Sequence, residues 1–392
     1  MKKTWLLGFG FFSISIIWAV YNAFVPYFLD SYLSSTALIG FMMTIDNYFA
    51  LFLQPWIGNA SDRTRTRFGR RMPYLLIGMP LAALFFVLIP LHGSLLTLVL
   101  FMVLMNLAMS IYRSPTIALM PDITPEARRT KANGIINFMG GLGGILAFGL
   151  GSQLYDANPS FPFVAAAAIT LLSLFIVYRY IREKRDGVVD IPAAPKRIKL
   201  RGELDRTTVL LLVAIFFWFV SYQGVEALFT LYGTHHLGLE QSVSSFSLTF
   251  FSLFFVLFAI PSGWLGNRYG KKRIILIGVC GLFLVFAIVP LIHSLLLLRL
   301  LLALGGIFWS CININSYPFV VSTGSESSIG TRTGLYYLVS SLAAISSPPL
   351  LGWIIDGFGY GSLFVCAAGG MLLALLFLLL VRHDGKTAAA VR

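Results

Sequence analysis

The stretch Gly58-Asn-Ala-Ser-Asp-Arg-Thr-Arg-Thr-Arg-Phe-Gly-Arg-Arg-Met-Pro73 decides how the chain must fold. It holds five arginines and one aspartate, whereas residues 36–57 before it and 74–91 after it are almost wholly apolar. Arginine and lysine near the end of a membrane-length apolar run resist translocation and stay on the cytoplasmic side. The stretch is therefore predicted to be a tight cytoplasmic loop between a second and a third membrane span.

The composition is that of an integral membrane protein. Of the 392 residues, 57% are hydrophobic and 11% are charged, whereas about 25% of residues are charged in a soluble domain. The apolar runs are unbroken rather than alternating, which predicts an all-α membrane protein and not a barrel. At roughly 20 apolar residues per span, twelve spans can be marked, at 5–29, 36–57, 74–91, 95–120, 132–154, 162–181, 208–232, 242–262, 274–292, 295–320, 332–355 and 361–381.

The basic residues also predict the orientation of these spans. With both termini in the cytoplasm, all but two of the 29 lysines and arginines fall on the cytoplasmic side, and the two exceptions, Arg113 and Arg299, fall inside spans. We therefore expect a multi-pass protein of the cell membrane. The net charge of +13 then reflects membrane topology and not a nucleic-acid partner, although the same basic face also suits anionic lipid heads.

The chain repeats its landmarks about 200 residues apart. The matched pairs are Gly58 with Gly263, Asp62 with Asn267, Arg63 with Arg268, Gly69 with Gly270, and Asp156 with Asp356. Two halves with the same landmarks indicate a duplicated unit. The predicted domains are a six-helix bundle at 1–181, a cytoplasmic linker at 182–207 and a second six-helix bundle at 208–392.

The two loops of the form Gly-x-x-x-[Asp/Asn]-Arg resemble the signature loop of the major facilitator superfamily. The longer pattern across residues 54–73 is similar, more narrowly, to the sucrose-type and glycoside–pentoside–hexuronide cation symporters. This resemblance implies twelve helices in two pseudo-symmetric bundles, with substrate bound between them and alternating access by rocking of the halves. It also implies that the loop gates the inner side, through Gly58, Asp62, Arg63, Gly69, Arg70 and Arg71.

Ionisable residues inside spans are costly and predict functional sites. Asp46 lies near the middle of the second span and Arg113 at a compatible depth in the fourth, so the two can pair if both spans face one cavity. A purely structural ion pair is the alternative. On the seventh span, Trp218, Tyr222 and Glu226 recur every four residues and share one helical face. Glu226 is interpreted as a gate or substrate ligand, or else as a residue near the span end that reaches water.

The candidate substrate site combines amides, carboxylates and aromatic rings. Amides and carboxylates serve hydroxyl groups, and aromatic faces stack on the C–H face of a sugar ring, so the set favours a neutral polyhydroxylated solute. A drug pocket would be more apolar. The predicted substrate-binding residues are Tyr21, Asn22, Asp46, Asn47, Asn106, Arg113, Asn137, Trp218, Tyr222, Gln223, Glu226, Trp309 and Asn313. Trp18 and Asn315 lie in two of the same spans, and Tyr336 adds an aromatic ring from the eleventh span.

The sequence has no nucleotide-binding loop, no nucleophile–base set and no metal-ligand cluster, so we expect neither an enzyme nor a cofactor. The predicted function is proton-coupled symport of a di- or oligosaccharide or glycoside, by a monomer. Asp46 and Arg113 are the predicted coupling pair, because burial favours a protonated carboxyl and a nearby arginine opposes it. Sodium-coupled melibiose-type relatives carry paired acids in spans 2 and 4, and the single acid here favours a proton.

Two other interpretations remain open. A proton-driven exporter or a lipid-type flippase would use the same fold, and a flippase would need an apolar side opening between the bundles. A receptor that binds without transporting would usually carry a long soluble output segment.

Overall fold

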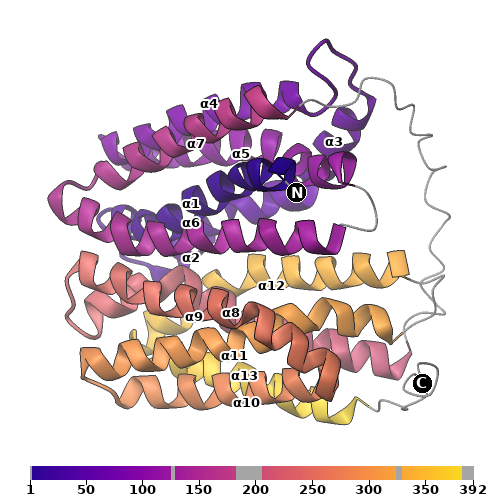
Figure 1. The fold of residues 1–392 in the computed structure, drawn as a ribbon. Coiled ribbons are helices and arrows are strands. Elements are labelled where there is room, and N and C mark those ends of the chain that lie inside the picture. The colour runs from indigo at the N-terminus through magenta and orange to yellow at the C-terminus, as the bar shows by residue number, and fades with distance from the viewer. Residues whose placement is uncertain (1, 125–128, 182–204, 324–328, 382–392) are drawn as a thin grey trace, which may run out of the picture.

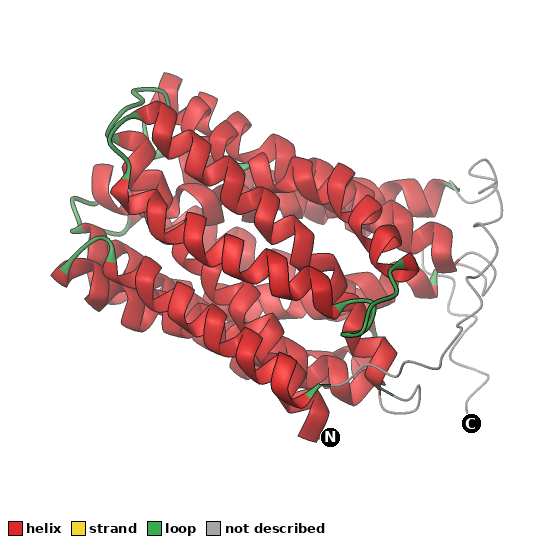
Figure 2. Cartoon of the chain, turned by 90° about the horizontal axis from the view of Figure 1, so that it is seen from above, coloured by secondary structure: helices red, strands yellow, loops and turns green. Residues whose placement is uncertain are grey.

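The computed structural model describes residues 2–124, 129–181, 205–323 and 329–381, and helices dominate these residues (Figures 1 and 2). Twelve helical stretches among them are long and apolar enough to cross a membrane, which confirms the predicted number of spans. The helices are α1 (Lys2–Asp30), α2 (Thr36–Met43), α3 (Ile45–Arg63), α4 (Met72–Leu88), α5 (Leu95–Ile123), α6 (Arg129–Ala157), α7 (Phe161–Tyr180), α8 (Arg206–His235), α9 (Gln241–Tyr269), α10 (Lys271–Ile288), α11 (Leu295–Ser322), α12 (Ile329–Phe358) and α13 (Ser362–Leu380). Residues 182–204 of the expected linker lie outside the described residues, and α8 already begins at Arg206.

The helices pack as two halves, which Figure 1 shows one above the other. In the first half, α1 packs on α6 and α7, and α5 packs on α3 and α4. In the second half, α8 packs on α12 and α13, and α11 packs on α9 and α10. The halves meet mainly where α6 lies against α9 and where α2 lies against α12, while α1 approaches α8 at the centre.

The second span is broken, which the sequence did not predict. Thr44 leaves helical geometry, with φ −95° and ψ 1°, and separates α2 from α3. Its hydroxyl donates to the carbonyl of Phe41 at 2.8 Å, a local bond that competes with the helical ladder. The break places Asp46 in the first turn of α3, where the helix dipole favours a negative charge.

The two ends of the molecule differ in charge. At one end, called the basic end here, the turn of residues 64–71 and the first turn of α10 after Gly270 are rich in arginine and lysine. The turns at the other end contain no lysine or arginine, and they adjoin Asp30, Asp156, Glu240 and Asp356. We call this the acidic end. Its turns are residues 31–35, 92–94, 158–160, 236–240, 292–294 and 359–361.

The turns at the basic end support the internal match between the halves. Gly69 has φ 110° and Gly270 has φ 95°, conformations that side chains with a Cβ rarely adopt. These two glycines are paired by the sequence repeat. The same backbone requirement therefore recurs in both halves at matched positions.

Candidate functional site: an aromatic cavity in the second half

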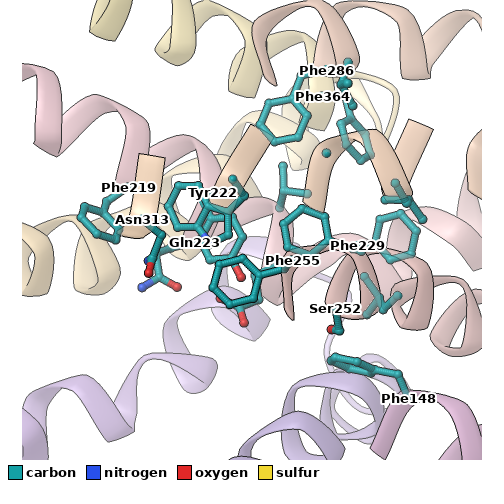
Figure 3. A pocket seen from close by; sticks show the side chains of 18 residues that line it. Phe148, Phe219, Tyr222, Gln223, Phe229, Ser252, Phe255, Phe286, Asn313 and Phe364 are labelled. Atoms are coloured by element: carbon teal, nitrogen blue, oxygen red, sulfur yellow. The ribbon is translucent and has the colours of Figure 1, made fainter. Parts of the chain in front are cut away.

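A cavity of about 310 Å³ lies within the second half, between α8, α9, α10, α11 and α13, and Phe148 of α6 reaches it from the first half. Five residues that the sequence predicted to bind substrate line it: Tyr222, Gln223, Glu226, Trp309 and Asn313. Helices α8 and α11 supply them, because each presents these residues along one face. In Figure 3 the amides of Gln223 and Asn313 lie on one side of the cavity, away from Phe286 and Phe364.

Aromatic rings dominate the walls of this cavity. The ring of Tyr222 stacks on Trp309 with 3.8 Å between centroids and 9° between planes. Phe251 lies against the same tyrosine at 5.8 Å, and Phe219 meets Trp309 edge-on at 5.7 Å. Nine of the 18 lining residues are aromatic: Phe148, Phe219, Tyr222, Phe229, Phe251, Phe255, Phe286, Trp309 and Phe364.

The polar groups of the cavity are few. Gln223, Glu226, Ser252 and Asn313 are its polar side chains apart from the ring groups of Tyr222 and Trp309. Glu226 lies one turn after Tyr222 on α8, and its carboxyl group interacts with the tyrosine hydroxyl. The site thus offers one carboxyl, two amides and one serine hydroxyl inside an aromatic enclosure, which suits a mainly apolar molecule with a small polar part.

Trp218 of the predicted substrate-binding set serves packing instead, as do Asn315 and Tyr336, which were considered beside that set. Trp218 is fully buried and lies outside the cavity lining, although it shares the helical spacing of Tyr222. Asn315 is 3% exposed and ties α11 to α9 by donating to the carbonyl of Ser262 at 3.3 Å and to its hydroxyl at 3.1 Å. Tyr336 is also buried and shares a 2.9 Å hydrogen bond with the hydroxyl of Ser316.

The predicted coupling residues lie near one another without forming a close ion pair. The Arg113 guanidinium stands 5.8 Å from the centroid of the Trp18 ring, and the described chain places no carboxylate oxygen within 4.0 Å of it. Asp46 nevertheless interacts electrostatically with Arg113 and with Glu226 of the other half. The side-chain amide of Asn47 donates to the Asp46 carboxylate at 3.0 Å. Asp46 therefore lies within electrostatic range of an ionisable group in each half.

The remaining candidates in the first half are outside the cavity lining. Asn106 and Tyr21 are buried together, and the amide donates to the tyrosine oxygen at 3.4 Å. Asn22 is half-buried on α1, whereas Asn137 is exposed on α6. The candidate residues that the sequence predicted in the first half therefore do not line the cavity in this conformation, and Phe148 is the residue of that half that does.

The predicted gating loop needs a correction. Gly58, Asp62 and Arg63 belong to the last turns of α3, and only Gly69, Arg70 and Arg71 lie beyond the helix. The loop prediction extended the turn too far, because one aspartate and one arginine in a helical end look the same in sequence as in a loop.

Arg71 is the centre of a network at the basic end. Its side chain is 6% exposed and pairs with Asp62, and its Nε donates to Asp122 at 3.1 Å. It also bonds to Ser61 and to the carbonyl of Gly58. Arg70 reaches the other oxygen of Asp122 at 2.7 Å, so the network ties α3, α4 and α5 together.

The sequence did not predict most of the aromatic residues that line the cavity. The chain has 34 phenylalanines, and those of the cavity stand in apolar helices beside others that face outward, such as Phe52 and Phe358. The polar face of α8 was the feature of the sequence that indicated the cavity. Apolar residues that face Glu226 from the neighbouring helices line that cavity.

Comparison with known proteins agrees with this architecture. The profile of the Major Facilitator Superfamily matches residues 7–248 and 234–391. An uncharacterised MFS-type transporter of Methanocaldococcus jannaschii is 26% identical, over 95% of this chain and 94% of that protein. The class H tetracycline resistance protein of Pasteurella multocida is 23% identical, over 93% and 92% of the two chains.

Solved structures show the same fold. A variant of the nucleoside transporter NupG superposes with a TM-score of 0.80 and 14% identity, over 97% of this chain and 100% of that one. A bacterial homologue of the human lysosomal transporter Spinster, in an inward-facing and occupied conformation, gives 0.75 and 16%, over 96% and 94%. With twelve membrane-length helices and a family profile that covers nearly all of its residues, the chain belongs to the Major Facilitator Superfamily of membrane transporters.

Proposed function

We propose that this transporter exports an amphiphilic organic solute in exchange for protons, as a monomer in the cell membrane with its basic end in the cytoplasm. The solute has a largely aromatic or lipophilic body and one basic or hydroxyl-bearing group. One observation carries this proposal: nine aromatic side chains surround a single carboxyl group in a cavity of about 310 Å³. Aromatic walls bind an apolar body, and Glu226 binds the polar group.

The polar groups of the cavity are too few for a fully hydroxylated solute. A buried hydroxyl without a partner costs about 1–3 kcal/mol, and a disaccharide carries more hydroxyls than Gln223, Glu226, Ser252 and Asn313 can serve. The small number of polar groups thus supports the exporter alternative over the sugar symporter that the intramembrane residues and the loop resemblance suggested.

The relatives support the same direction of transport. Besides the class H protein, the class B tetracycline resistance protein of Escherichia coli is 24% identical over 92% of this chain. Proteins named for resistance to an amphiphilic, multi-ring compound match this chain along nearly its full length. The compound in their names is a property of those proteins, and tetracycline is therefore used only as a probe for this one.

Coupling to protons is proposed through the charged groups at the centre. Glu226 holds either a proton or the polar group of the solute, so that each displaces the other. Asp46 and Arg113 form the second element, because protonation of Asp46 removes its attraction for the arginine. If Asp46→Asn keeps full accumulation with an unchanged pH dependence, this role of Asp46 is wrong.

Sugar symport is a second candidate, and one observation favours it. Tyr222 and Trp309 form a flat stacked platform, and two amides, Gln223 and Asn313, line the same cavity. A sugar ring could stack on such a platform while the amides bind adjacent hydroxyls.

The sign of the proton gradient distinguishes the two functions. The full chain is reconstituted in liposomes and tested with radiolabelled tetracycline and sucrose, under a pH gradient imposed in each direction. An antiporter accumulates solute inside vesicles with an acidic interior, whereas a symporter does so when the exterior is acidic. We expect tetracycline to accumulate with an acidic interior, above the level in protein-free liposomes, and sucrose to remain at background.

Matched variants assign the effect to the cavity. Glu226→Gln keeps the shape of the side chain and removes its charge, so we expect at least a tenfold loss of accumulation, on the order of one charged hydrogen bond. Glu240→Gln removes the same charge from an exposed position at the acidic end and should leave transport within twofold of the parent. Sucrose accumulation with an acidic exterior would establish the second candidate, and accumulation driven only by a sodium gradient would refute proton coupling.

A further inference from the structure

Asp356, in the last turn of α12, holds the beginning of α2 in the other half of the molecule. Its Oδ1 accepts a hydrogen bond from the backbone N–H of Thr36 at 2.6 Å. Its Oδ2 accepts from the hydroxyl of Ser35 at 2.7 Å and from the N–H of Ala37 at 3.1 Å. One carboxylate thus binds three donors that precede it by about 320 residues.

These bonds complete the N-terminal cap of α2. The first N–H groups of a helix have no partner within it. In α2, those of Thr36 and Ala37 are taken by Asp356, and the N–H of Leu38 is taken by the Ser35 side chain at 3.4 Å. The helix therefore depends on the opposite half for two of its terminal bonds, and separating the halves at this end leaves both donors without their partner.

Asp356 occupies a position that its own helix disfavours. A helix carries partial negative charge at its C-terminus, so an acidic residue in the last turn is unfavourable there and favourable at the N-terminus of another helix. Within α12 nothing compensates the charge in that turn, where no basic residue is present. The hydrogen bonds to α2 explain why an acidic residue stands in the last turn of α12.

The same arrangement recurs in the duplicated half. Asp156 lies in the last turn of α6 and matches Asp356 in the sequence repeat. Its Oδ1 accepts from the hydroxyl of Ser242, in the first turn of α9, at 3.3 Å. The preceding Tyr155 donates to the side chain of Gln241 at 2.9 Å. This second copy makes one carboxylate bond instead of three.

The backbones of α2 and α12 are in direct contact beside the first copy. A Cβ at Gly40 would lie 2.3 Å from the carbonyl oxygen of Pro348, and a Cβ at Gly352 would lie 2.4 Å from that of Thr36. This approach is possible only with glycine. The bonds of Asp356 to α2 therefore belong to the closed arrangement of this end and are lost when the helices separate.

We propose that Asp356 and Asp156 are two pseudo-symmetric latches that hold the acidic end of the transporter shut. Each bonds to the first turn of a helix in the opposite half or to the residue before it, Asp356 as a cap of α2 and Asp156 through the side chain of Ser242 on α9. Asp356 is the stronger latch because it binds three donors. The two latches act whatever solute is transported, because no residue of the cavity lining takes part in them.

The test measures closure directly and without solute. Spin labels are attached at Gly93→Cys and His293→Cys, which are exposed, lie in turns of the two halves at the acidic end and take no part in the latches. The background lacks Cys280, Cys311 and Cys366, and the full chain is studied in lipid nanodiscs by double electron–electron resonance. Closed and open populations appear as a short and a long distance.

Asp356→Ala is expected to raise the open-to-closed ratio about fivefold, the usual effect of removing one helix cap. Asp356→Asn, which keeps an acceptor and a similar shape, should give a smaller increase and covers the case in which the alanine variant does not fold. Asp156→Ala should also raise the ratio, by less than Asp356→Ala. Glu240→Ala is the matched control, since this exposed acid makes no side-chain cap and should leave the ratio unchanged.

If both Asp356 variants leave the ratio within the range of Glu240→Ala, the latch does not exist. Equal effects of Asp156→Ala and Asp356→Ala would overturn the assignment of Asp356 as the stronger latch. Neither outcome depends on which solute is carried, so a failure of the proposed export function is distinguishable from a failure of this inference.

Discussion

Replacing Arg71 with alanine should destabilise the first half more than removing any exposed arginine of the same loop. The Arg71 side chain is 6% exposed and donates to Asp122, Asp62, Ser61 and the carbonyl of Gly58.

The expected magnitude follows from what each partner loses. A hydrogen bond to a charged group contributes about 1.5–3 kcal/mol, but Asp62 is 46% exposed and can turn to water, so its pair with Arg71 contributes little. Asp122 keeps Arg70 at 2.7 Å, and is not left as an unpaired buried charge. The substitution therefore removes the hydrogen bonds of Arg71 to Asp122, Ser61 and Gly58. Part of this loss of stability is offset, because folding no longer has to remove the guanidinium from water. We expect a decrease of about 2–4 kcal/mol in the free energy of unfolding.

The assay is equilibrium unfolding of the full chain in mixed micelles by a denaturing detergent, followed by circular dichroism. Arg65→Ala is the control, because Arg65 is exposed in the same turn, and it should change the free energy by less than about 0.5 kcal/mol. Arg71→Lys keeps the charge without the planar set of donors and should fall between the two. If Arg71→Ala and Arg65→Ala are equal within error, the network does not stabilise the fold and the reasoning fails.

Three further predictions concern single contacts. Asn315→Ala removes the buried bonds between α11 and α9 and should lower stability by about 1–3 kcal/mol in the same unfolding assay. Gly270→Ala forces a Cβ into φ 95° and should cost about 1–3 kcal/mol, whereas Gly93→Ala, with nothing within 4 Å of its Cβ, should be neutral. For Asp205, burial alone would raise the pKa of the carboxyl, but the hydrogen bonds from Thr208 outweigh it and lower that pKa. Its stabilisation is therefore present at neutral pH and lost as the pH falls through the lowered pKa, and Asp205→Asn, which still caps α8, should weaken the acid dependence of the thermal midpoint.

The sequence predicted the structural features that depend on residues close to one another along the chain. Hydropathy over windows of about 20 residues defined twelve spans, and spacing along one helix placed Tyr222 and Glu226 on a common face. The repeat matches Gly69 with Gly270, and both have positive φ. Each of these rests on a local property that the sequence carries directly.

The features that sequence missed depend on packing between distant segments. Trp218 shares the spacing of Tyr222 but turns into the core, because the neighbouring helices decide which part of that face meets the cavity. The break at Thr44 has no proline or glycine to announce it. The match between Asp156 and Asp356 was visible in the sequence, yet their partners lie in the opposite half and no local pattern points to them.

The two ends of the molecule are built for different tasks. At the basic end, the Arg71 network joins α3, α4 and α5 within the first half. At the acidic end, nine hydrogen bonds among the described residues join one half to the other, and the proposed opening of this end requires them to break.

Variants at the two ends should therefore separate in two measurements. Arg71→Ala should lower the free energy of unfolding while leaving the open-to-closed ratio of the acidic end near its parent value. Asp356→Ala should change that ratio about fivefold with a smaller loss of stability, because both conformations of the folded transporter remain available. If each variant instead shifts both quantities in proportion, the halves do not move as rigid bodies, and closure of the acidic end is coupled to folding of the whole chain.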